Sequence, residues 1–186
     1  MNEQVVSFDD EPLILVDEKD QICGYKNKID CHMGEGILHR AFSILIFNKN
    51  KELLLQKRSR DKMLWPLTWS NSCCSHPRKG ESYKQASERR MLEELGFSTP
   101  LTYLYRFQYQ AQYKNKGSEN ELCSVFIGRH DGEVIINQNE IDEWKFISIP
   151  DLEHELAIKP GEYTPWFKIE WKRIKEEHLK NLDKLF

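Results

Sequence analysis

Several features that would assign this chain to a particular class of protein are missing from its sequence. The longest apolar run, Phe42 to Phe47, is far shorter than the roughly 20 apolar residues that span a bilayer. The net charge of -3 lacks the basic excess of a general nucleic-acid binder. The N-terminal segment is acidic and has no basic and apolar regions like those of a signal peptide. We therefore expect a cytoplasmic protein that binds neither membrane nor nucleic acid.

Cysteine is scarce, and its spacing excludes two further classes. The five cysteines are an odd number with no Cys-x-x-Cys pair: Cys23, Cys31, Cys73, Cys74 and Cys123. This pattern favours reduced thiols over a disulfide scaffold. It also argues against a zinc-binding module built on Cys73, Cys74 and His76, because such modules usually pair their ligands. We interpret Cys23, Cys31 and Cys123 as small buried apolar side chains.

Strand and helix signals are mixed along the whole chain, without a repeat or a linker. Apolar runs and alternation predict strands at residues 13–16, 41–47, 52–57, 101–113, 121–129 and 143–149. Turn residues at 48–51 and 115–117 predict two hairpins that join neighbouring strands. A length of 186 residues suffices for one real core. The sequence therefore predicts one mixed α/β domain that spans residues 1–186.

Helix signals are strongest where a capping residue precedes an apolar pattern. Ser82 and Gln85 form a capping box, so a helix is predicted from Ser82 to Leu95, ended by Gly96. A short helix opens at 150–152, and a C-terminal helix begins at Thr164 with a proline in its first turn. The apolar positions of the last helix keep a helical spacing, which predicts that it packs on the rest of the domain.

The most informative stretch runs from Asn71 to Pro77, just ahead of the glutamate-rich helix. It combines a thiol with an imidazole, so thiol chemistry, metal ligation and diphosphate binding are all open there. Further along, Glu119 and Glu121 lie two residues apart and would face the same side of a strand. The imidazoles of His32, His39 and His76 with these two carboxylates would suit Mn²⁺, Mg²⁺ or Zn²⁺. Periodicity alone does not bring these five residues together.

The glutamate-rich helix resembles the Nudix box. That pattern runs Gly, five residues, Glu, seven residues, Arg-Glu, two residues, Glu-Glu, one residue, Gly, and it is matched by Glu81, Arg89, Glu93, Glu94 and Gly96. Ser75 replaces the first glycine of the pattern, and Arg90 replaces the glutamate of its Arg-Glu pair. In that superfamily the carboxylates hold magnesium against a diphosphate. The alternative is a charged surface helix with ion pairs four residues apart.

Taken as a whole, the chain resembles the type I isopentenyl-diphosphate isomerases, a branch of the Nudix superfamily. The resemblance rests on Trp65-Pro66, Trp69 to Ser72, Cys74 to Pro77, Glu119 to Glu121 and Pro165-Trp166, together with the basic residues named below. It implies a Nudix-type αβα sandwich with mixed and antiparallel sheets. It also implies an enzyme that reversibly converts isopentenyl diphosphate to dimethylallyl diphosphate by protonation and deprotonation.

The resemblance further implies a role for individual residues. The metal site would consist of His32, His39, His76, Glu119 and Glu121. Glu94 would hold a second ion, a magnesium that arrives with the diphosphate. The diphosphate oxygens would be contacted by Lys28, Arg58, Lys62 and Ser75. Cys74 and Glu121 would be the acid and base in either order, with Tyr109 assisting Glu121 and with Trp166, or Trp69, facing the cationic centre.

The same fold leaves one alternative activity open. A Nudix pyrophosphohydrolase acting on a nucleoside or isoprenoid diphosphate is the alternative within the same fold, but Ser75 and Arg90 depart from its motif. For either enzyme the partner is a small diphosphate, and we expect a monomer or a weak homodimer. The motif places the reactive thiol two residues before the histidine, which selects Cys74 over Cys73.

Overall fold

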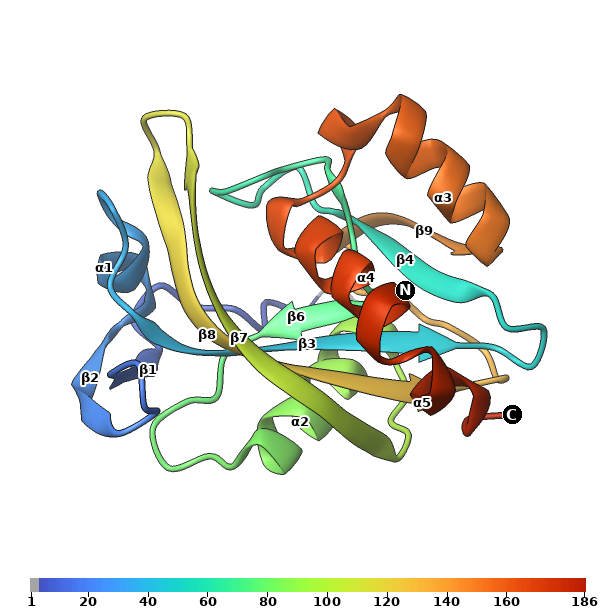
Figure 1. Ribbon diagram of the computed structural model, residues 1–186. Helices are drawn as coiled ribbons and strands as arrows, with labels where there is room; N and C mark the ends of the chain where they lie inside the picture. Colours follow the sequence, from blue (N-terminus) through green and yellow to red (C-terminus); the bar gives the residue numbers. More distant parts are fainter. Residues whose placement is uncertain (1–3) are drawn as a thin grey trace.

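A nine-stranded sheet forms the framework of the protein in the computed structural model, which describes residues 4–186 (Figure 1). Its strands are β1 (Pro12–Val16), β2 (Ile22–Asn27), β3 (His39–Phe47), β4 (Leu53–Arg58), β5 (Trp69–Ser70), β6 (Cys73–Ser75), β7 (Leu101–Tyr113), β8 (Gly117–Arg129) and β9 (Ile141–Ile147). β3 is central, because it pairs in parallel with β8 along its whole length and antiparallel with β6. β7 and β8 form the predicted antiparallel hairpin.

Helices cover both faces of this sheet (Figure 1). They are α1 (Lys28–His32), α2 (Tyr83–Leu95), α3 (Ile149–Ile158), α4 (Pro165–Glu177) and α5 (Leu179–Asp183), with a 3-10 turn, η1 (Pro160–Glu162). Alternate residues of β3 face opposite cores: Phe42 and Ile44 pack with α2, while Ala41 and Leu45 pack with α4. Because both faces are covered, the strand is apolar throughout. The predicted mixed α/β sandwich is confirmed.

Local signals fix the ends of α2 as the sequence predicts. The Ser82 side chain accepts a hydrogen bond from the Gln85 amide, and the Gln85 side chain accepts one from the Ser82 amide. Gly96 ends the helix in the left-handed region at φ 77°. A Cβ at Gly96 would lie 2.9 Å from the Cβ of Ile135, so this position needs glycine both for its backbone and for its neighbour.

Three predictions about the elements need correction. β3 and β4 follow one another in the chain, but they pair only at Phe47 and Leu53. The two sides of β3 are paired with β8 and β6, and β4 pairs with β9 instead. β9 begins at Ile141 rather than Glu143, and Ile149 already belongs to α3. The C-terminal helix is interrupted at His178, whose φ of -126° separates α4 from α5.

The cysteines and the helices bear on the predicted thiol state and on membrane insertion. All five cysteines are free, but Cys23 is exposed, so its interpretation as a buried side chain was wrong. Among residues 4–186, no helix has the length and apolarity needed to cross a bilayer.

Candidate active site

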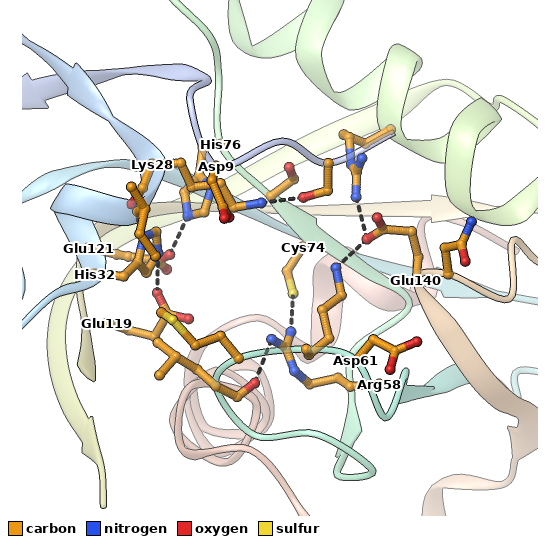
Figure 2. Close-up of a pocket in the computed structure, with 18 of the residues that line it drawn as sticks. Asp9, Lys28, His32, Arg58, Asp61, Cys74, His76, Glu119, Glu121 and Glu140 are labelled. Carbon is orange, nitrogen blue, oxygen red and sulfur yellow. Dashed lines mark hydrogen bonds and ion pairs between the residues drawn. The ribbon is translucent and has the colours of Figure 1, made fainter. Parts of the chain in front are cut away.

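A cavity of about 340 Å³ opens beside β6 and β8, where most of the predicted site residues meet (Figure 2). All the residues predicted to act line its wall except His39, Glu94 and Trp69, the alternative to Trp166. The wall also contains Val5, Ser7 and Asp9 from the N-terminal segment. The sequence left open whether that segment is flexible or covers the site; its first residues, 1–3, lie outside the described part of the chain.

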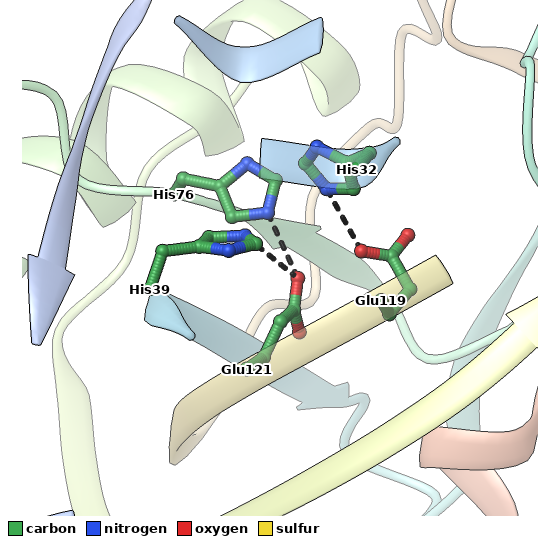
Figure 3. A group of neighbouring side chains, drawn as sticks. All are labelled: His32, His39, His76, Glu119 and Glu121. Carbon is green, nitrogen blue, oxygen red and sulfur yellow. Dashed lines mark hydrogen bonds and ion pairs between the residues drawn. The ribbon is translucent and has the colours of Figure 1, made fainter. Parts of the chain in front are cut away.

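Five side chains from four separate parts of the chain form one cluster (Figure 3). His32 ends α1, His39 begins β3 and His76 follows β6. Glu119 and Glu121 both lie on β8. The two carboxylates share a face of β8 because strand side chains alternate. One ligand atom from each residue lies within 4.8 Å of the others. The sequence predicted these ligands only through the resemblance, and the fold brings all of them together.

A glycine makes the close approach of α1 to β8 possible. Gly117 begins β8 at φ 154°, and a Cβ there would lie 2.2 Å from the carbonyl oxygen of His32. No side chain can be accommodated at that distance. The position of His32 next to Glu119 therefore depends on glycine two residues before that carboxylate.

The imidazoles of the cluster are oriented by backbone carbonyls. The Nδ1 atoms of His32 and His39 lie 2.7 Å from the carbonyl oxygens of Lys28 and Ile37, so each Nδ1 donates and each Nε2 faces the carboxylates. His39 Nε2 is buried without a hydrogen-bond partner, 3.8 Å from Glu121 Oε1. Ligands on opposite sides of a divalent cation lie about 4.2 Å apart, close to the spread of these atoms. The donor set therefore fits Mn²⁺, Mg²⁺ or Zn²⁺.

Burial and charge also prepare the cluster for a cation. Burial lowers the pKa of His39 to about 4 and lowers that of His76 well below its ordinary value, so both imidazoles are neutral near pH 7. Although burial opposes ionisation of Glu119, the neighbouring His32 holds the pKa of that carboxyl at about 2. Burial, followed by the charge of Glu119, raises the pKa of Glu121 well above its ordinary value. Positive charge is therefore favoured between the two carboxylates.

The acid–base candidates lie around the same cavity. Tyr109 donates a hydrogen bond of 2.6 Å to Glu121 Oε2, and His76 Nε2 lies 2.8 Å from Glu121 Oε1. Cys74 lines the cavity, whereas Cys73 belongs to the core under α2, because neighbouring residues of β6 face opposite ways. Burial raises the pKa of the Cys74 thiol to about 12, against the opposing charge of Arg58. In this arrangement the Cys74 sulfur carries its proton near pH 7.

The cavity wall also holds the ammonium and guanidinium groups of Lys28, Arg58, Lys62 and Arg90. Burial, and then the charge of Lys62, lower the pKa of Lys28 to about 8. Arg58 Nη1 lies 3.9 Å from Cys74 Sγ, and its guanidinium lies 5.2 Å from the centre of the Trp166 ring. The positive charge of Arg58 therefore lies next to the thiol.

Arg58 also holds the backbone of the segment that follows β4. Its Nε donates to the carbonyl of Trp65 at 3.1 Å, and its Nη2 donates to that of Leu64 at 2.9 Å. Trp65 and Leu67 have φ values of 45° and 54°, in the left-handed region that side chains seldom adopt. Leu64 lines the cavity next to Trp166, so one guanidinium supports the apolar wall and faces the polar one.

Like His39, Trp69 and Glu94 lie outside the cavity wall. Trp69 packs beneath the ammonium groups of Lys57 and Lys145, which leaves Trp166 as the predicted tryptophan that faces the cavity. The Glu94 carboxylate is buried and accepts from Nε and Nη2 of Arg90, the ion pair that the helical spacing predicted. A magnesium at Glu94 would have to compete with this guanidinium.

Arg90 itself has no donor to spare. Its five N–H groups make five hydrogen bonds, two with Glu94 and one each with Glu93, Glu140 and the carbonyl of Val6. Sequence reasoning missed Glu140, which lines the cavity although it belongs to no motif. Its only sequence signal is a polar stretch, 137–140, between two apolar segments.

Comparison with known proteins supports the resemblance. The NUDIX domain pattern matches residues 37–167. Isopentenyl-diphosphate Delta-isomerase 1 of Photorhabdus laumondii is 43% identical over 174 residues, covering 92% of this chain and 99% of that protein. Isopentenyl-diphosphate Delta-isomerase of Pectobacterium atrosepticum is 38% identical over 162 residues, covering 87% and 90%.

Solved structures share the fold at lower identity. A crystal structure of a Deinococcus radiodurans protein superposes with a TM-score of 0.66 at 24% identity, covering 80% of this chain and 90% of that one. The MutT protein of Methanosarcina mazei gives a TM-score of 0.63 at 21% identity, covering 76% and 96%. These two likenesses concern the fold alone.

Proposed function

The chain belongs to the NUDIX family and, within it, to the isopentenyl-diphosphate Delta-isomerases, and from this premise we propose which of its side chains carry the reaction. The enzyme converts isopentenyl diphosphate to dimethylallyl diphosphate in isoprenoid biosynthesis. The reaction adds a proton to the terminal methylene carbon and removes one from the carbon next to the oxygen-bearing carbon. An isolated alkene is a poor base, so the proton donor must act in a pocket that excludes water.

Glu121 and Cys74 are proposed as the two groups that exchange protons with the substrate. One observation carries this assignment: both line the same cavity, with the His–Glu cluster around Glu121 and Arg58 beside Cys74. Tyr109 would hold the carboxyl group of Glu121 in place through its hydrogen bond. A divalent cation in the cluster would offset the negative charge of the two buried carboxylates. The raised pKa of Cys74 favours the thiol as the form present before substrate binds.

The remaining roles concern binding. The ammonium and guanidinium groups of Lys28, Arg58 and Lys62 would hold the diphosphate oxygens, with Ser75 nearby in the wall. Trp166, which is 3% exposed, would stabilise the tertiary cationic centre by roughly 1–2 kcal/mol through its ring face. Glu94 would hold the magnesium that accompanies the diphosphate, beside the guanidinium of Arg90. We propose that residues 1–186 work as one domain.

Hydrolysis of a diphosphate is less supported as the activity. A Nudix hydrolase uses the helix carboxylates for metal, and here the carboxylates of Glu93 and Glu94 are both bound by Arg90. Arg90 stands at the position where the Nudix pattern has a further glutamate. The guanidinium of Arg90 therefore lies against the carboxylates that would bind metal ions in a hydrolase.

The deciding experiment follows isopentenyl diphosphate in deuterated water with magnesium and manganese present. Wild type should form dimethylallyl diphosphate that carries deuterium and should release no phosphate. Cys74→Ala should lower the rate by about 10²–10⁴-fold, as expected for loss of a proton-transfer group. Phosphate release without isomerisation would contradict the proposal and favour the hydrolase.

Cys73→Ala is the matched control. It removes the neighbouring thiol from the core under α2, on the other side of β6 from the cavity. Its turnover should stay near the wild-type value, even if the small core cavity lowers its stability. If Cys73→Ala lost activity as Cys74→Ala did, the selection of Cys74 would be wrong.

A further inference from the structure

Asp9, Asp61 and Glu140 are carboxylates of the cavity wall with no assigned role, and Glu140 is the one buried against Lys62 and Arg90. Glu140 precedes β9 and is 3% exposed. Its amide donates to the carbonyl of Asn137 at 3.0 Å, and its carbonyl accepts from the amide of Ser59 at 2.9 Å. The amide of Asn137 donates in turn to the carbonyl of Glu94, at 2.9 Å. The backbone thus holds Glu140 between the C-terminal turn of α2 and the segment that follows β4.

The carboxylate of Glu140 joins two cations that would otherwise repel each other (Figure 2). One oxygen, Oε2, accepts from Lys62 Nζ and, at 2.9 Å, from Arg90 Nη2. The Lys62 side chain is 22% exposed and that of Arg90 is 4% exposed. Burial opposes ionisation of Glu140, but Lys62 and Arg90 hold its pKa at about 2. The carboxylate is therefore charged at every pH at which the enzyme would work.

The two cations differ in what they can offer a ligand. Arg90 spends all five donors on protein acceptors, so it balances charge without binding anything else. Lys62 has three donors, and Glu140 engages one of them. An ammonium on a flexible stem keeps a fixed direction only if a partner holds it. In this cavity the partner is Glu140.

We propose that Glu140 is a positioning residue of the diphosphate site, which directs the Lys62 ammonium toward the bound diphosphate. This inference rests on the proposed function, which assigns diphosphate to Lys62. Glu140 does not touch the reacting atoms; it acts through Lys62. Charge alone predicts that loss of this carboxylate makes the cavity more positive and strengthens anion binding. Positioning predicts that a diphosphate bound with a misplaced lysine turns over slowly.

These two effects are separated by measuring binding and turnover on the same variants. Glu140→Gln should lower kcat at least about 10-fold, while its Kd for magnesium pyrophosphate, measured by calorimetry, should be unchanged or lower. Asp142→Asn is the matched control, because it removes one negative charge two residues away, from an ion pair with Arg60 outside the cavity wall. The control should keep the wild-type kcat and Kd.

A double-mutant cycle tests whether Glu140 acts through Lys62. Lys62→Met should lower kcat/KM by about 100-fold, and adding Glu140→Gln to it should change kcat/KM by less than about 2-fold. Additive losses would overturn the proposal, as would a Glu140→Gln enzyme that matches Asp142→Asn. If Glu140→Gln alone does not fold, the double variant Lys62→Met/Glu140→Gln is compared with Lys62→Met. A difference in kcat/KM above about 2-fold between them would overturn the proposal.

Failure of the proposed function would look different. In that case wild type itself would not isomerise isopentenyl diphosphate. Pyrophosphate binding would then still test the proposal, and a Glu140→Gln variant whose Kd for magnesium pyrophosphate rose above that of Asp142→Asn would overturn it.

Discussion

Glu170 gives the most demanding test of how this structure handles buried charge. Its carboxyl group lies in α4 with 0% exposure, and one of its oxygens, Oε2, has no hydrogen-bond partner. Burial raises its pKa from 4.5 to about 8, and hydrogen bonds from Ser43 and Cys123 offset only part of this effect. The group is therefore mostly uncharged at pH 7 in the folded protein, whereas in the unfolded chain it is ionised.

The sign and size of the effect on stability follow from this difference. A raised pKa means that the contribution of Glu170 is favourable below pH 4.5 and is lost as pH rises to about 8. At about 1.4 kcal/mol per pH unit, the loss amounts to roughly 4 kcal/mol between pH 5 and pH 8. Glu170→Gln has nearly the same shape but cannot ionise. Its free energy of unfolding should therefore exceed that of wild type by an amount that grows by roughly 4 kcal/mol over this range.

Urea unfolding of both proteins at half-unit pH steps measures this difference directly. Glu176→Gln is the control, because Glu176 lies in the same helix with a 60% exposed side chain. The free energy of unfolding of this control should differ from that of wild type by an amount that is constant across pH within about 0.5 kcal/mol, as for ordinary surface substitutions. Parallel pH curves for wild type and Glu170→Gln would refute the reasoning, since they would mean that Glu170 ionises as easily in the fold as in water.

Three further outcomes are expected. Tyr109→Phe removes the hydrogen bond to the proposed catalytic carboxyl group and should lower the rate of deuterium incorporation about 10-fold, the equivalent of about 1.4 kcal/mol; an unchanged rate would contradict its assisting role. Chelation of the cation should lower the free energy of unfolding by about 4 kcal/mol relative to protein with cation at 1,000 times its Kd, and His39→Ala should abolish that difference; equal urea midpoints with and without chelator would exclude a folded-state metal site. Gly96→Ala should cost more stability than Gly80→Ala, by about 1–2 kcal/mol, because both have positive φ but only Gly96 has Ile135 within 3 Å; equal costs in urea unfolding would show that the contact is relieved.

The features that sequence predicted well are those that depend on near neighbours in the chain. The capping box of Ser82 and Gln85 and the stop at Gly96 are decided within one helix, and the structure has both. The shared face of Glu119 and Glu121 follows from strand alternation alone. The two hairpins differ, however. The β7–β8 hairpin is paired throughout, whereas β3 and β4 separate after one pair, because partners distant in sequence take their edges.

The site itself was predictable only in part from residue types. No periodicity relates His32, His39 and His76, which reach one cluster because α1, β3 and β6 meet near β8. Only the resemblance joined them in advance. Glu140 had no such help, since its importance comes from Lys62 and Arg90, which lie 78 and 50 residues away. A carboxylate that works through distant partners has no local signature.

Arg58 contacts both the polar and the apolar part of the cavity wall. The guanidinium that would face a diphosphate also binds the carbonyls of Leu64 and Trp65, and Trp65 has a left-handed backbone with φ 45°. Binding of the diphosphate group and the conformation of the apolar wall are then thermodynamically coupled. The affinity for a whole ligand therefore differs from the sum expected for its two parts. Inorganic pyrophosphate alone should already protect segment 59–67 from amide hydrogen exchange, and exchange that ignored pyrophosphate would show that the two ends are independent.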